Sequence, residues 1–284
     1  QARLTRFRQN RLGVISLFVF AVIFVICMAA NVIANDKPLL VKYQDDYYFP
    51  VLKAYPETTF GGVFETETNY KDPAVQSLID EQGYYVMPPI PFADQTPNVE
   101  LGVPYPAAPN SQNWLGTDDL GRDVLARILY GMRVSLLFGL ALTLAGALIG
   151  IIVGAIQGYY GGWVDLAGQR FMEVWGGMPQ LFMIIILVSL FSPSITTLFA
   201  MMLLFGWMGL VGLVRAEFLR ARNFDYVRAA RNLGVSDSQI MLRHILPNAL
   251  ASSLSQLPFI LTANIIALTA LDFLGYGLPP GSPS

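Results

Sequence analysis

One basic stretch, positions 215–247, holds six arginines and is the part of the sequence best suited to recognise another molecule. The chain has one cysteine, Cys27, and one histidine, His244, and it contains no HExxH, GxSxG or P-loop sequence. Hydrolase, redox and metal chemistry therefore have no residues to work with, and neither does ATP binding of the P-loop kind. The pattern favours recognition of another molecule through a basic helical surface.

The spacing in this stretch predicts a short helix–turn–helix. A first helix covers 225–233, with Asp225 as its cap and Gly234 as its stop. Ser236 and Gln239 fit the capping box of a second helix, which meets the next proline. A plain basic loop facing the cytoplasm is the alternative, and charge alone would support only that.

The first helix is expected to carry its apolar side chains on one face and its charges on another. The apolar set is Tyr226, Val227, Ala230 and Leu233. Arg228 and Arg231 turn away from it. The small pair Ala229-Ala230 and the glycine stop favour a surface shaped to enter a groove on a partner.

The elements that hold this loop are expected to lie in a membrane. Of the 284 residues 54% are hydrophobic and only 13% are charged, and the net charge of −2 gives no basic surface for nucleic acid. We predict an all-α polytopic membrane protein, because a spanning helix needs about 20 apolar residues and the runs are too long for barrel strands. The expected spans are 12–34, 134–159, 171–190, 195–214 and 254–273.

The first run could instead be a cleaved signal peptide, but it is longer than a signal core, which favours an uncleaved anchor. Lys/Arg bias places the N-terminal tail, 1–11, and the loop 215–250 in the cytoplasm. Both can lie on the same side of the membrane only if an even number of spans separates them, and the four expected spans between them meet this condition. We expect a multi-pass protein of the bacterial cytoplasmic (inner) membrane with its N-terminus inside. The tail's charges are Arg3, Arg6, Arg8 and Arg11.

The segment 35–112 is expected outside and differs in composition. It is acidic, proline-rich and too aromatic for a disordered linker, so we expect a small irregular periplasmic domain. One short helix is predicted at 72–82, with Asp72 as cap, Pro73 in its first turn and Gly83 past its end. The segment is either a docking surface for an outer partner or a packed loop covering the membrane domain, and the residues do not separate the two.

Several residues within or beside the spans have expected roles. Glycines at 146, 150, 154 and 158 leave a bare helix face for close packing of another helix. Asn264 lies in mid-span and should face another helix or the translocation path, with Pro179 and Glu173 as further path residues. Pro179 and Pro258 are expected to kink their helices. Arg170 can pair with Glu173 one turn on. Acidic residues at 118, 119 and 123 are expected to cap an outer helix.

Three motifs carry a resemblance. Arg228-Ala229-Ala230, three residues, Gly234, nine residues and His244-Ile245-Leu246-Pro247 resemble the EAA loop of ABC importer permeases. Arg228 stands where the motif has Glu, and His244 where it has Ile. Asn113 to Val124 and Leu271 to Pro280 are similar to segments of dipeptide and oligopeptide permeases of the C-subunit type. The resemblance covers about 113–284, which is expected to be the permease core, together with the N-terminal anchor.

The long outer insertion is similar to that of E-subunit permeases of Yej-type importers, which are associated with oligopeptides and the peptide antibiotic microcin C. The resemblance implies a type I ABC importer transmembrane domain with a sixth span beyond Ser284. We also expect the chain, which starts at Gln1, to be part of a longer protein. Without the resemblance, a channel, a membrane enzyme, an anchored outer domain or a receptor lacking ATP coupling would compete.

The resemblance also implies partners. These are a second, distinct permease subunit, a cytoplasmic ABC ATPase that binds ATP and Mg²⁺, a periplasmic peptide-binding protein and a peptide cargo. This chain is then not an enzyme and holds no cofactor. The implied ATPase-coupling residues are Arg222, Tyr226, Arg228, Ala229, Ala230, Arg231, Gly234, Leu246 and Pro247.

Overall fold

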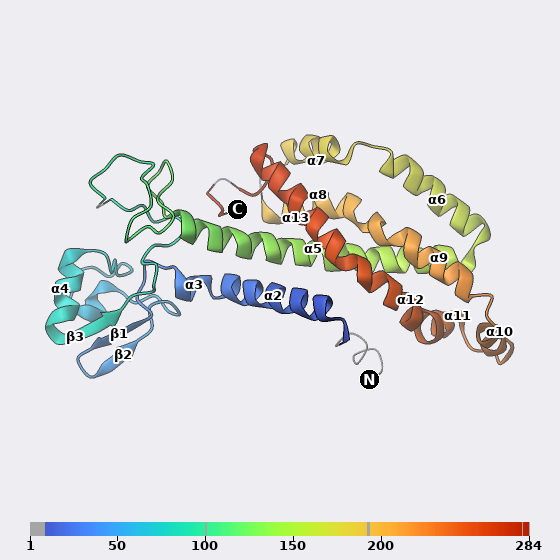
Figure 1. Ribbon diagram of the computed structural model, residues 1–284, viewed down its shortest axis with the longest axis horizontal. Coiled ribbons are helices and arrows are strands. Elements are labelled where there is room, and N and C mark those ends of the chain that lie inside the picture. Colours follow the sequence, from blue (N-terminus) through green and yellow to red (C-terminus); the bar gives the residue numbers. More distant parts are fainter. Residues whose placement is uncertain (1–8, 100, 192–193, 280, 284) are drawn as a thin grey trace. The chain divides into compact units, whose positions relative to one another are not determined.

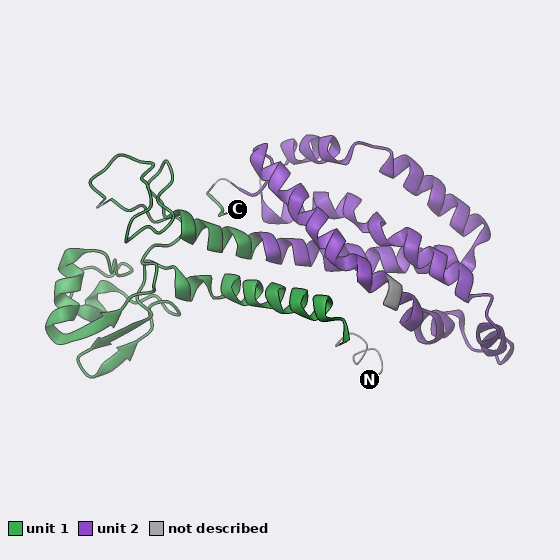
Figure 2. Cartoon of the chain, in the orientation of Figure 1, with its two compact units in different colours: residues 1–134, 281–284 green, residues 135–280 purple. Residues whose placement is uncertain are grey.

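A computed structural model of the protein describes residues 9–99, 101–191, 194–279 and 281–283. The chain divides into two compact units, 1–134 with 281–284, and 135–280 (Figure 2). Most of the predicted basic tail, including Arg3, Arg6 and Arg8, lies outside the described residues.

The first unit begins with helix α2, Arg11–Met28, which is apolar around its whole circumference and largely exposed. Asn10 caps it by accepting a hydrogen bond from the Gly13 amide at 3.1 Å. A short helix, α3 (Ala30–Ile33), continues the run. The Tyr130 hydroxyl donates to the Ala34 carbonyl at 2.9 Å and ties the end of this run to the beginning of α5.

The outer segment of this unit holds a small antiparallel sheet of order β2-β1-β3, visible in Figure 1. Its elements are β1 (Leu40–Tyr43), β2 (Asp46–Tyr48), η1 (Glu57–Phe60), α4 (Pro73–Gln82) and β3 (Gly83–Val86). Phe60 is buried at its centre, with tyrosine rings packed edge-on around it.

The predicted helix is confirmed here, since the Asp72 carboxylate accepts from the Ala74 amide at 2.9 Å and Gly83 ends α4. The expectation of an irregular domain was wrong in one respect, because the segment contains a sheet. Strands of three or four residues are too short to show an alternating pattern in sequence.

A polar cluster precedes α5 (Val124–Tyr160). Asp123 caps this helix by accepting from the Ala126 amide at 2.7 Å, as predicted. Asp118 pairs with Arg122 at 2.8 Å and with Arg127 at 3.0 Å. Burial alone would raise the pKa of Asp118, but the Arg122 and Leu120 amides and the Arg122 guanidinium outweigh it and lower that pKa. No cluster of three or more potential metal ligands occurs in the described parts of the chain.

The second unit is helical (Figure 1). Its elements after α5 are α6 (Gly162–Gly176), α7 (Gln180–Ser189), α8 (Ile195–Gly206), η2 (Trp207–Leu210), α9 (Val211–Ala221), α10 (Asp225–Asn232), α11 (Asp237–Gln239), η3 (Ile240–Ile245), α12 (Leu246–Ser253), η4 (Leu254–Gln256) and α13 (Leu257–Phe273). Among the residues that the structure describes, four helical segments are long and apolar enough to cross a membrane, namely Arg11–Met28, Val124–Tyr160, Ile195–Ala221 and Leu254–Phe273. Helices α6 and α7 together count as a fifth, bent by 73°.

The glycine face of α5 packs directly on backbone, as the spacing predicts. A β-carbon at Gly150, Gly154 or Gly158 would lie 2.5–2.7 Å from a carbonyl oxygen of the segment formed by η2 and α9. Those oxygens belong to Trp207, Val211 and Arg215. The two helices therefore approach as closely as backbone atoms allow, which locks α5 and α9 together.

The predicted span 171–190 is not one continuous helix. Gly176 and Gly177 end α6, and Pro179 stands at the cap of α7. Proline disfavours helical geometry in the residue before it, and the two glycines weaken the helix there, so the chain turns at this point. Pro258 lies in the first turn of α13, where a missing amide costs little, and so it does not kink that helix.

Candidate functional site

Helix α10 ends in a complete glycine stop. Gly234 adopts the left-handed conformation, with φ +79°. Its amide bonds the Arg231 carbonyl at 3.0 Å, and the Val235 amide bonds the Ala230 carbonyl at 3.1 Å. This is a Schellman motif, so the helix ends with its last carbonyls satisfied. Asp225 lies in the first turn, and Phe224 takes the cap position that the sequence had assigned to Asp225.

One face of α10 is packed and the other is bare. Val227 and Ala230 are buried in a core with Phe218 of α9 and Ile240 of η3. Arg228 and Arg231 are exposed, as predicted. Tyr226 and Leu233, which were expected on the same face as Val227 and Ala230, are exposed to 42% and 83%, so only part of that face is packed.

The second helix differs from its prediction. Ser236 precedes α11 but makes no capping bond to a backbone amide, so the predicted capping box is absent. After three residues the chain enters η3, a π-helical turn, and continues into α12. Pro247 lies in the first turn of α12 instead of ending the helix. The wider turn accommodates a proline, which has no amide to donate.

Tyr159, in the last turn of α5, joins this loop at several points. Its hydroxyl accepts a hydrogen bond from Arg231 at 2.9 Å and donates one to Asp237 at 2.5 Å. Its carbonyl accepts from Arg222 at 3.3 Å. The side chain is 3% exposed, and the Arg231 guanidinium lies 5.3 Å from the ring centre.

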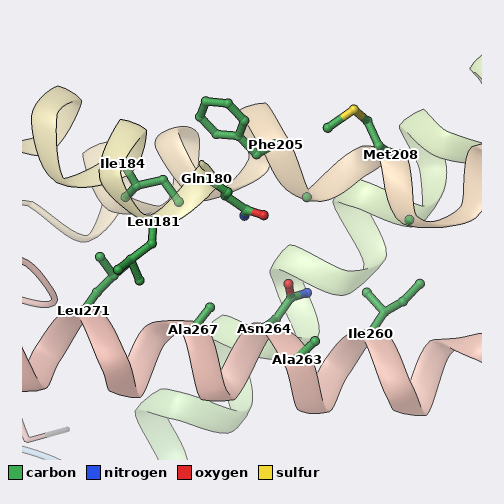
Figure 3. A pocket seen from close by; sticks show the side chains of 12 residues that line it. Gln180, Leu181, Ile184, Phe205, Met208, Ile260, Ala263, Asn264, Ala267 and Leu271 are labelled. Atoms are coloured by element: carbon green, nitrogen blue, oxygen red, sulfur yellow. The ribbon is translucent and has the colours of Figure 1, made fainter. Parts of the chain in front are cut away.

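A cavity of about 580 Å³ lies between α7, α8 and α13. Its lining is apolar apart from two amides, Gln180 and Asn264, which both point into the space between α7 and α13 (Figure 3). The Asn264 amide nitrogen also donates to the Thr143 hydroxyl of α5 at 3.0 Å. Asn264 therefore bonds another helix, which was one of the two alternatives expected for it, and it also lines a cavity. Pro179 and Glu173 do not line it, and Glu173 pairs with Arg170 at 2.6 Å.

Comparison with known proteins identifies the family. Residues 128–284 match the family described as binding-protein-dependent transport system inner membrane component, and residues 1–54 match the N-terminal transmembrane domain of oligopeptide transport permease C. The chain belongs to this permease family.

Relatives agree with this placement. The chain is 56% identical to an inner membrane ABC transporter permease protein, YejE, of Escherichia coli, over all of the chain and 83% of that protein. It is 47% identical to a peptidoglycan transport system permease, YejE, of Agrobacterium fabrum, over 99% of the chain and 80% of that protein. A dipeptide transport permease, DppC, of Bacillus subtilis is 37% identical over 60% of the chain and 53% of that protein.

Membership in the permease family confirms the resemblance drawn from the three motifs, including its Yej-type branch. It also confirms the fold class, a polytopic helical membrane domain of an ABC importer. The outer insertion aligns along its length with both YejE proteins, whereas the dipeptide permease matches only 170 residues.

The residues expected to couple the permease to an ATPase fall into two groups. Tyr226, Arg228, Ala229, Arg231 and Gly234 are exposed on or just after α10. Ala230 and Leu246 pack inward, Pro247 lies at the start of α12, and the half-buried Arg222 holds Tyr159. The first group is exposed, whereas Ala230, Leu246 and Arg222 of the second are buried or half-buried and Pro247 is exposed.

Three residues of the permease were missed from sequence. Tyr159 ends a glycine-bearing span, and nothing local marks it as a contact for a loop 72 residues away. Asp165 pairs with Arg215 of α9 through two oxygens, one at 2.6 Å from Nη2. Gln180 follows Pro179, and a polar residue opening an apolar helix was the one available signal for it.

Proposed function

We propose that this chain is the permease subunit of an importer that moves oligopeptides from periplasm to cytoplasm by alternating access. The names of the dipeptide, oligopeptide and peptidoglycan permeases among its relatives support a peptide or peptide-bearing cargo, and microcin C is one such peptide. The observation that carries the coupling is α10, a short helix with one face in the core and the other bare.

The importer needs further subunits. A second homologous permease completes the membrane channel as a heterodimer, and a periplasmic binding protein delivers the peptide. A cytoplasmic ABC ATPase binds ATP and Mg²⁺, because this sequence contains no P-loop. The N-terminus and α10 lie on the cytoplasmic side of the inner membrane, in agreement with their arginines.

The bare face of α10 docks into a groove of the ATPase. Its exposed side chains include an apolar one, Leu233, and two cations, Arg228 and Arg231. A short amphipathic helix of this kind recognises a groove by its exposed anchors. The groove therefore presents an apolar pocket with carboxylates at its rim. Arg228 stands where related loops carry Glu, so this contact also selects the matching ATPase.

The test compares two charge reversals in the full complex. Arg228→Glu should lower peptide-stimulated ATP hydrolysis by about tenfold or more, because it places like charges together at the interface. Arg243→Glu is the matched control, since Arg243 is an exposed arginine of η3 outside α10. Equal loss in both variants would show that only loop charge matters, and no loss in either would exclude α10 as the docking element.

The cavity beside α13 lies on the path of the cargo. An apolar wall with two amides can hold varied side chains while Asn264 and Gln180 bond the peptide backbone, whose groups are the same in every peptide. Asn264→Ala should lower peptide uptake severalfold at subsaturating cargo. Thr262→Val on the same helix should leave uptake unchanged, because Thr262 does not line the cavity and bonds its own helix at the Pro258 carbonyl. Normal uptake by Asn264→Ala would remove this cavity from the path.

A further inference from the structure

Tyr159, in the last turn of α5, bonds two separate elements of the cytoplasmic loop through its hydroxyl. Its hydroxyl accepts from Arg231, in the last turn of α10, and donates to Asp237, the first residue of α11. Both partners are exposed, ionised groups, whereas the tyrosine is buried. Hydrogen bonds with a charged partner are the stronger kind. The single hydroxyl oxygen of Tyr159 therefore links the end of α10 to the start of α11.

A third contact fixes the loop's other end. Arg222, directly after α9, donates to the Tyr159 carbonyl at 3.3 Å. Gly161 keeps room for this arginine, since a β-carbon there would lie 2.2 Å from its Nη1 atom. The beginning and the end of the α10 segment are thus both tied to the same residue of α5.

Helix α5 is in turn fixed to α9 along its length. The glycine contacts at 150, 154 and 158 bring α5 onto the carbonyl oxygens of η2 and α9 with no side chain between them. Backbone-to-backbone packing cannot yield by a rotamer change. A displacement of α10 that reaches Tyr159 is therefore passed to α5 and α9 together.

We infer that Tyr159 is a positioning residue for energy coupling: its hydroxyl holds α10 and α11 to the end of α5, so that movement of the docked helix displaces the membrane spans. This rests on the proposed function, because it takes the ATPase to be the source of the movement. Arg231 then has two roles, because it contacts the ATPase and also donates a hydrogen bond to the Tyr159 hydroxyl.

The variant Tyr159→Phe removes the hydroxyl and keeps the ring. Tyr160→Phe is the matched control, because Tyr160 is the next residue, is half-exposed and makes no hydrogen bond through its hydroxyl in the described structure. Both would be measured in the full complex in proteoliposomes, as peptide imported per ATP hydrolysed. In Tyr159→Phe this ratio should fall at least threefold while the ATPase still co-purifies, and in Tyr160→Phe it should not change.

A second measurement tests the contact without the ATPase. Amide hydrogen exchange of residues 225–239 in the purified permease should become at least about tenfold faster in Tyr159→Phe. Tenfold is the factor expected for one lost hydrogen bond to a charged group, and this variant loses two, to Arg231 and to Asp237. Asp237→Ala removes one of these two bonds from the exposed side, and it should speed exchange in the same direction if Tyr159→Phe does not assemble. The double variant should be no worse than Tyr159→Phe alone.

The outcomes separate the two proposals. If no ATPase co-purifies with the unaltered chain, the proposed function fails, whatever the exchange data show. If the ATPase is present and Tyr159→Phe keeps the normal ratio of peptide to ATP, Tyr159 does not transmit the movement. Equal exchange rates in Tyr159→Phe and Tyr160→Phe would likewise overturn the inference.

Discussion

The glycine face of α5 yields a prediction whose size follows from the structure. In Gly158→Ala the new β-carbon would lie 2.5 Å from the Arg215 carbonyl oxygen and 2.6 Å from the Phe218 β-carbon. The first distance is about 0.9 Å less than an ordinary contact of 3.4 Å. The clashing atoms are a backbone oxygen and a β-carbon, which no change of rotamer can move away, so α9 itself must shift.

Overpacking of this kind costs about 1–3 kcal/mol. Replacing glycine by alanine within a helix returns about 1 kcal/mol. The net loss in Gly158→Ala is then up to about 2 kcal/mol, so the apparent Tm in detergent should fall by up to roughly 8 °C. Gly146→Ala is the control from the same face, since its nearest neighbour, the Gly206 oxygen, lies at 3.4 Å. It should be neutral or slightly stabilised.

The measurement is thermal unfolding of both variants in one detergent, followed by circular dichroism. Equal Tm values for Gly158→Ala and Gly146→Ala would refute the reasoning, because the two substitutions differ in the space available at α9. A larger fall for Gly146→Ala would show that the close approach lies elsewhere along the helix.

Three further predictions concern single residues. Tyr70→Phe should stabilise the outer sheet by about 1 kcal/mol, because the Tyr70 hydroxyl is buried with no hydrogen-bond partner in the described structure; slower amide exchange at β1 would show it. The lowered pKa of Asp118 adds stability that is present at neutral pH and is lost as pH falls below the usual carboxyl range. In Asp118→Asn the free energy of unfolding should therefore fall less steeply as the pH is lowered through the acid range. An unchanged slope would contradict this. Gly234→Ala should destabilise the loop by about 1–2 kcal/mol through its positive φ, although space around its β-carbon is open; unchanged exchange protection of α10 would count against it.

Much of the membrane architecture follows from local composition. Long apolar runs predict spans because a helix is the only way to satisfy backbone groups in lipid over that length. Capping residues predicted α4 and the start of α5, since each cap acts within three residues of itself. The bend at Pro179 was indicated by the sequence too, because a proline inside an apolar run was expected to kink its helix.

The coupling loop was also predicted in part, because its signals too are local in the sequence. A seven-residue motif and its glycine stop located α10, and Arg228 and Arg231 were placed correctly on its exposed face. Tyr226 and Leu233 were expected beside Val227 and Ala230 but are exposed, because periodicity says which residues share a side and not how many of them the core covers.

The sequence by itself determined the class of the protein, the positions of its helices and the residues of the coupling helix, because these depend on composition and on spacings of a few residues. Only the tertiary structure decided which residues hold that helix in place. Tyr159 meets Arg231 and Asp237 across 72 and 78 positions of the chain, and Asn264 meets Thr143 across 121. Contacts over such separations depend on how the helices pack, and neither periodicity nor propensity encodes that packing locally.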